Sequence, residues 1–97
     1  MEIPLEFKNM ALRMHQDLPE FISMTSENEI VEYLAGGVGV EERGPIVIFL
    51  DRVLASDLEP DDLARMWVEA GADWFVSSKG IIRFLTMLRD ELKSSLV

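Results

Sequence analysis

Residues 57–71 read DLEPDDLARMWVEAG, and this stretch carries signals for both the beginning and the end of a helix. Proline is favoured at the first helical position, which Pro60 would take, because its missing N–H would be unpaired there in any case. Glu59 then holds the capping position, and two acids follow in the first turn, where they complement the positive end of the helix dipole. Gly71 accepts the left-handed conformation in which helices commonly end. We therefore predict a helix between Glu59 and Gly71.

The same helix has one apolar face. Leu63, Met66, Trp67 and Ala70 recur at helical spacing, which is the pattern of a stripe packed against a core. Leu58 and Leu63 stand at the two positions of a hydrophobic staple. We expect Trp67 to be a core residue.

Four other segments show similar apolar stripes. Each is bounded by proline, glycine or a capping residue. Amphipathic helices joined by short loops pack as a bundle. We therefore predict one all-α domain over residues 1–97, with four to five helices, the four further ones being Pro4 to about Gln16, Glu27 to Ala35, Pro45 to Ala55 and Gly80 to Ser95.

Three segments are less well defined. The apolar run Ile46 to Leu50 suits a buried strand by composition, but its continuation to Ala55 at helical spacing favours a helix. The residues Trp74 to Val76 suit a short extended, strand-like link. Gly36 to Gly44 has the composition of an exposed loop, and its first two glycines are expected to end the preceding helix in the left-handed conformation.

The composition indicates a soluble protein of a reducing compartment. Of its 97 residues 48% are hydrophobic and none is cysteine, which excludes disulfides and thiolate chemistry. The N-terminus lacks the apolar core of a secretory signal, and the longest purely apolar run is too short to span a bilayer. We expect the protein to be cytoplasmic, without a membrane association.

The charge is strongly negative and unevenly placed. The formal net charge is −9, and residues 14–42 contain seven acids and no lysine or arginine. Residues 51–64 contain five acids and one arginine. Phosphate backbones would be repelled by such a surface, so nucleic acid is a poor partner. A basic protein would be attracted, although acidity that only keeps the domain soluble is an equally good interpretation.

The residues that could carry chemistry do not form a recognisable site. His15 is the only histidine, and its nearest acid, Asp17, is two residues away and so on another helical face. The acids from Asp57 to Asp62 resemble a calcium loop, but the sixth and twelfth positions lack the required glycine and glutamate. We therefore expect no enzyme activity, no cofactor and no metal site.

Several short motifs, taken in order, carry a resemblance to a known family. They are His15-Gln16-Asp17, then Phe49-Leu50 and Val53-Leu54, then Leu63, Trp67 and Gly71-Ala72-Asp73, and finally Ile82-Arg83-Phe84-Leu85 with Leu88 and Leu92. From about residue 7 to residue 92 the chain resembles the immunity proteins of bacterial contact-dependent growth inhibition systems. The resemblance implies a small cytoplasmic protein that binds and neutralises a toxin domain, often a nuclease.

Toxin nucleases have basic clefts that bind phosphate, so an acidic inhibitor would complement them. The expected partner is therefore a basic toxin domain, bound by a chain that is a monomer beforehand. The alternative is a small acidic adaptor or chaperone-like interaction module. Trp74 is the one apolar candidate, as an exposed anchor, although core packing is the favoured interpretation for it. The candidate contact residues are this tryptophan and acids of the two dense stretches: Asp17, Glu20, Glu27, Glu41, Glu42, Asp57, Glu59, Asp61, Asp62 and Trp74.

Overall fold

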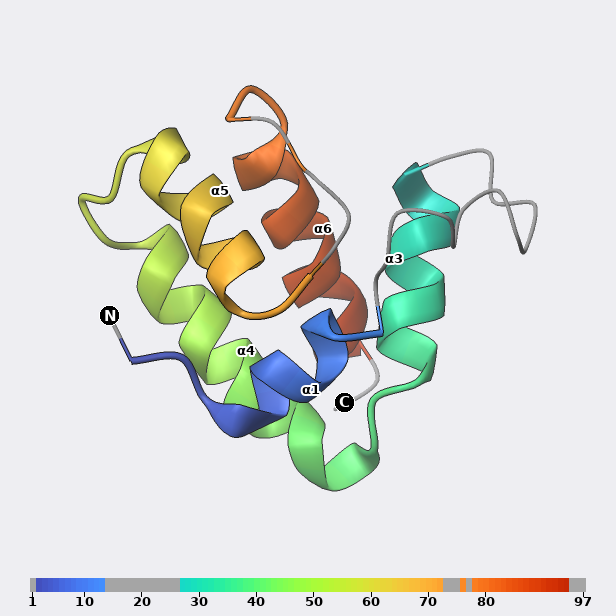
Figure 1. Cartoon of the computed structure of the whole chain (residues 1–97). Coiled ribbons are helices and arrows are strands. Elements are labelled where there is room, and N and C mark those ends of the chain that lie inside the picture. The colour runs from blue at the N-terminus through green and yellow to red at the C-terminus, as the bar shows by residue number, and fades with distance from the viewer. Residues whose placement is uncertain (1, 14–26, 73–75, 77, 95–97) are drawn as a thin grey trace.

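The computed structural model describes residues 2–13, 27–72, 76 and 78–94, and this part of the chain is an all-α domain. Its helices pack into one bundle, and the described residues contain no strand (Figure 1). The prediction of a small all-α bundle is thus confirmed. The helices are α1 (Leu5–Ala11), α3 (Glu27–Gly36), α4 (Val40–Leu54), α5 (Pro60–Glu69) and α6 (Ile81–Ser94).

Helix α6 is the centre of the packing. It contacts α3, α4 and α5, whereas α1 packs on α4 (Figure 1). The apolar stripe predicted for this helix is buried, since Ile81, Phe84, Leu85, Leu88 and Leu92 are all fully shielded from solvent. A helix that contacts three neighbours needs such a broad apolar face, because each neighbour covers a different part of it.

A row of aromatic rings joins four of the helices. Phe49 of α4 lies 5.0 Å from Phe7 of α1, measured between ring centroids. Phe7 lies 5.9 Å from Trp67 of α5, and Trp67 lies 5.2 Å from Phe84 of α6. The last two pairs are edge-to-face, an arrangement that the quadrupoles of aromatic rings favour. The expectation that Trp67 is a core residue is confirmed, because its side chain is completely buried.

The two ends of α5 agree with the prediction from the sequence. Pro60 is the first helical residue, and Glu59 before it has the extended backbone of a capping residue. The N–H of Glu59 donates to Oδ2 of Asp62 at 3.3 Å, which is one bond of a capping box. After the helix, Gly71 has a φ of 112° and is the only described glycine with a positive φ. Its left-handed conformation reverses the chain at the end of α5.

The beginning of α4 differs from the sequence-based prediction. We expected an exposed loop up to Gly44 and a helix from Pro45, but the helix begins at Val40 and contains Pro45. Gly39 provides the extended capping backbone, and the acids that follow it lie in the first turn, where the helix dipole stabilises them. Pro45 cannot donate to the carbonyl of Glu41, but Glu41 is exposed to water. The helical interpretation of residues 46–50 was correct.

Two other boundaries also differ. Helix α1 ends at Ala11 instead of near Gln16, and the N–H of Arg13 bonds to the carbonyl of Met10, three residues back. This tighter spacing closes the last turn. Helix α3 ends at Gly36, one residue beyond the predicted Ala35, and the positive φ expected at the glycines there is not observed. The proposed link from Trp74 to Val76 lies outside the described residues, except for Val76, which is buried.

We expect the substitution Trp67→Ala to destabilise the domain more than any exposed change. It removes the ring that contacts both Phe7 and Phe84 and leaves a cavity, so the free energy of unfolding should fall by about 3–5 kcal/mol. Urea denaturation measures this difference. Ile48→Ala, on the exposed side of α4, is the control and should change the same quantity by less than about 1 kcal/mol. Equal effects of the two substitutions would contradict the central role of the aromatic row.

Candidate partner-binding surface

The acids predicted between α4 and α5 lie together at one edge of the bundle. Asp57 and Glu59 belong to the connecting segment and Asp61 to the first turn of α5, and all three side chains are exposed. The segment is held in place, because the Ser56 hydroxyl donates to the carbonyl of Val53 at 2.6 Å. Leu58 also packs against the core. The acids are therefore presented from an anchored segment.

Asp62 differs from its three neighbours. It is half-buried, accepts the hydrogen bond from the N–H of Glu59, and its Oδ1 lies 3.7 Å from Nη1 of Arg65. Within the described part of the chain, Asp57, Glu59 and Asp61 form no ion pair. Asp62 thus belongs to the structure of the helix end, and the Glu59 side chain is the other member of the capping box. Asp57, Glu59 and Asp61 are all exposed to a partner. We call these three residues the junction acids.

The second predicted acidic stretch lies elsewhere. Glu41 is exposed and Glu42 half-buried, both in the first turn of α4. Helix α4 contains 15 residues, so its two ends are about 20 Å apart at 1.5 Å per residue. The structure therefore does not bring these glutamates next to the junction acids, which follow the other end of α4 (Figure 1). One partner would have to extend along the whole helix to contact both groups.

The remaining predicted contact residues are not placed by the structure. Asp17, Glu20 and Trp74 lie outside the described residues. Glu27 is the first residue of α3, but its side chain also lies outside them. These four positions remain predictions from the sequence.

A groove between α5 and the beginning of α6 was not anticipated from the sequence. It consists of two adjoining hollows of about 530 and 350 Å³, which share Asp61 and Ser78. Val68 and Ile82 line it and are 48% and 47% exposed. We call it the α5–α6 groove, and its full lining is Glu59, Pro60, Asp61, Ala64, Arg65, Val68, Ser78, Lys79 and Ile82.

One signal in the sequence points to this groove. Val68 follows the buried Trp67, and Ile82 follows the buried Ile81, so each lies about 100° around its helix from the core stripe. Large apolar residues out of phase with the buried stripe are exposed unless something else covers them. A search for such residues finds these two positions, but the fold alone determines that the two hollows that they line adjoin.

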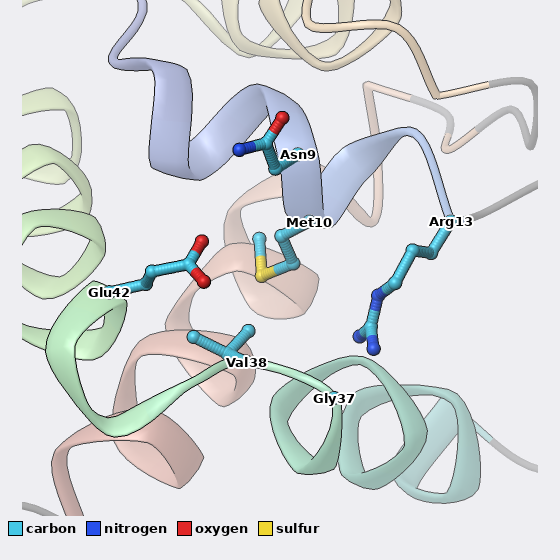
Figure 2. Close-up of a pocket in the computed structure, with 6 residues that line it drawn as sticks. All are labelled: Asn9, Met10, Arg13, Gly37, Val38 and Glu42. Atoms are coloured by element: carbon cyan, nitrogen blue, oxygen red, sulfur yellow. The ribbon is translucent and has the colours of Figure 1, made fainter.

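A separate hollow, of about 150 Å³, lies where α1, α3 and α4 meet. Arg13 points toward the end of α3, and Glu42 lies on the other side, with Met10 and Val38 between them in the view of Figure 2. The guanidinium of Arg13 donates to the carbonyls of Leu34 and, at 3.4 Å, of Tyr33. Arg13 therefore caps α3 from the turn that follows α1.

Arg43 caps the same end of α3 from α4. Its Nη2 donates to the carbonyl of Ala35 at 2.9 Å, and its Nε donates to the carbonyl of Val38 at 3.2 Å. The last carbonyls of a helix have no partner within it, and arginine near them also favours the negative end of the dipole. The two arginines perform the role that we had assigned to a left-handed glycine. We interpret this hollow as structural.

The described residues offer no obvious reaction centre. None of the buried residues among them is polar or charged. They contain no group of three or more His, Cys, Asp or Glu side chains placed to hold a metal ion. None of the helices in this part of the chain has the length and apolar character needed to cross a membrane.

Comparisons with known proteins identify no relative. No family model matches the chain, and no curated protein or solved structure shows a significant similarity to it. The functional argument therefore rests on the chain's own charge and surface.

Two adjacent glycines test the capping by Arg13. A Cβ on Gly37 would lie 1.1 Å from Nη1 of Arg13, whereas a Cβ on Gly36 has no atom within 4 Å. Gly37→Ala should therefore displace Arg13 and lower the free energy of unfolding by about 1 kcal/mol. Gly36→Ala is the control and should be neutral or stabilising by up to about 1 kcal/mol.

A double-mutant cycle with Arg13→Ala, measured by urea denaturation, isolates the effect. In the Arg13→Ala background, Gly37→Ala should lower the free energy of unfolding much less than in the wild type, because the guanidinium that it displaces is already absent. If Gly37→Ala lowered the free energy of unfolding equally in the wild type and in Arg13→Ala, Gly37 would be required for a reason other than its contact with Arg13.

Proposed function

We propose that the chain is a toxin-neutralising immunity protein that acts in the cytoplasm and binds a basic, nuclease-type toxin domain. The observation that carries the proposal is the group of junction acids, Asp57, Glu59 and Asp61. They are exposed, anchored and without ion pairs in the described part of a chain with a formal net charge of −9. The resemblance of the sequence to immunity proteins agrees with this interpretation.

Of the bases in the described part of the chain, Lys79 lines a hollow with Glu59 and Asp61 but is outnumbered by the three junction acids, and three arginines are engaged elsewhere. Arg13 and Arg43 donate to backbone carbonyls at the end of α3. The guanidinium of Arg89 in α6 lies 3.4 Å from the carboxylate of Asp51 in α4 and 3.1 Å from that of Asp90. Its ion pairs are therefore with acids other than the junction acids. The negative field at the junction therefore extends into solvent. Such a field accelerates the encounter with a basic protein and repels phosphate backbones.

Anchoring of the acids also favours tight binding. Side chains that are presented from a fixed helix end lose less freedom on binding than those of a mobile loop. Here the capping contact between Glu59 and Asp62 and the packing of Leu58 fix the backbone before a partner arrives. A charged surface of this kind contributes both to the association rate and to the specificity of the complex.

Titration calorimetry against the C-terminal domain of the protein encoded immediately upstream tests the proposal. We expect one-to-one binding with a free energy of about −12 kcal/mol, which corresponds to a nanomolar constant. Replacement of Asp57, Glu59 and Asp61 by lysine should weaken this binding by at least about a hundredfold and flatten its dependence on salt.

A matched variant controls for net charge. Replacement of Glu2, Glu32 and Glu69 by lysine changes the charge equally at exposed sites outside the junction, and it should have a much smaller effect. An equal loss of affinity in the two variants would mean that binding depends only on the overall charge of the protein. No binding of the wild-type chain at micromolar concentrations would remove the immunity function.

The exposed apolar pair in the α5–α6 groove favours one alternative, a small acidic adaptor with another protein partner. Val68 and Ile82 would then be contact residues of an interaction that is unrelated to a toxin. Failure of the upstream domain to bind would favour this alternative over the immunity function.

A further inference from the structure

The α5–α6 groove combines apolar walls with an acidic edge. Val68 of α5 and Ile82 of α6 each leave about half of their side chain exposed. Ala64, which is 8% exposed, lines the same hollow as Val68. Glu59 and Asp61 form the edge at the beginning of α5. Two of the three junction acids therefore line a hollow that also offers apolar contacts.

The charges of the groove are arranged asymmetrically. Glu59 and Asp61 form no ion pair within the described part of the chain, and Asp57 precedes them on the same connecting segment. Of the two bases in the lining, Arg65 lies 3.7 Å from Asp62, and Lys79 comes from the segment before α6. At this end of the groove the three junction acids thus outnumber Lys79, which lines the same hollow as Glu59 and Asp61.

This pattern selects the chemistry of the occupant. A second copy of the chain would bring its own net charge of −9 against the acidic edge, so self-association there is disfavoured. Phosphate-bearing ligands are disfavoured for the same reason. An amphipathic helix that carries lysine or arginine beside an apolar face complements both parts, and grooves between helices commonly receive such helices.

We propose that the α5–α6 groove is the docking site for a basic amphipathic helix of the partner. Apolar side chains of that helix pack on Val68 in one hollow and on Ile82 in the adjoining hollow, and its lysine or arginine side chains lie against Glu59 and Asp61. This inference rests on the proposed function for the identity of the partner, but the groove and its preference for a basic helix do not depend on that identity.

Substitution of the two apolar side chains tests the proposal. Val68→Ser combined with Ile82→Ser changes only side chains that are about half exposed, so the fold should be retained, as circular dichroism and thermal unfolding verify. Ile48→Ser is the matched control, because Ile48 is 61% exposed on α4 and does not line the groove. The double variant should weaken binding of the upstream-encoded domain by at least about tenfold, and the control by less than about twofold.

A defined peptide supplies an independent measurement. The probe has roughly 18 residues, with leucine on one helical face and lysine on the other, and a second peptide replaces every lysine by glutamate. In proton–nitrogen correlation spectra of the labelled protein, the lysine peptide should shift the amides of the groove lining, above all those of α5 and the beginning of α6. The double variant should weaken this binding by at least about tenfold, and the glutamate peptide should not bind.

The outcomes separate the two proposals. Where the upstream domain binds the wild type and the double variant equally, the immunity function stands and the groove is not the docking site. Where that domain does not bind at all, the peptide decides: shifts confined to the groove support the docking site without the immunity function. Amide chemical-shift changes centred outside the groove on addition of the lysine peptide would then overturn the proposal for the groove. An unchanged affinity of the double variant for that peptide would overturn it as well.

Discussion

The packing of Trp67 is the interaction on which the rest of the structure depends. Its ring lies between Phe7 of α1 and Phe84 of α6, and Phe7 continues the row to Phe49 of α4. Because α5 contributes this ring, the position of α5 is fixed relative to three other helices. The acids at the beginning of α5 are therefore held at a defined place on the surface. The core in this way determines the geometry of the surface that we assign to binding.

Much of the fold follows from local patterns in the sequence. The stripe Leu63, Met66, Trp67 and Ala70 predicts both the extent and the buried face of α5, and the stripe of α6 does the same. The beginning of α4 was mispredicted, because Pro45 was interpreted as a helix start and Glu41 and Glu42 as loop residues. A proline inside a helix is tolerated here since the carbonyl that loses its partner, that of Glu41, belongs to an exposed residue.

The candidate site could be predicted only in part. Exposure of Asp57, Glu59 and Asp61 follows from their place around a helix start, but their separation from Glu41 and Glu42 depends on the length of α4. That the hollows lined by Val68 and by Ile82 adjoin depends on how α5 packs on α6. The capping of α3 by Arg13 and Arg43 was also missed, because contacts between distant segments leave no periodic signal.

The most direct test of the central claim is the salt dependence of the association rate, measured by stopped flow with the upstream-encoded domain. A negative field at the junction acids that attracts a basic partner predicts an association rate that falls steeply as ionic strength rises, while the dissociation rate changes little. An association rate that is insensitive to salt, with an affinity governed only by dissociation, would contradict an acidic surface that recruits its partner by charge.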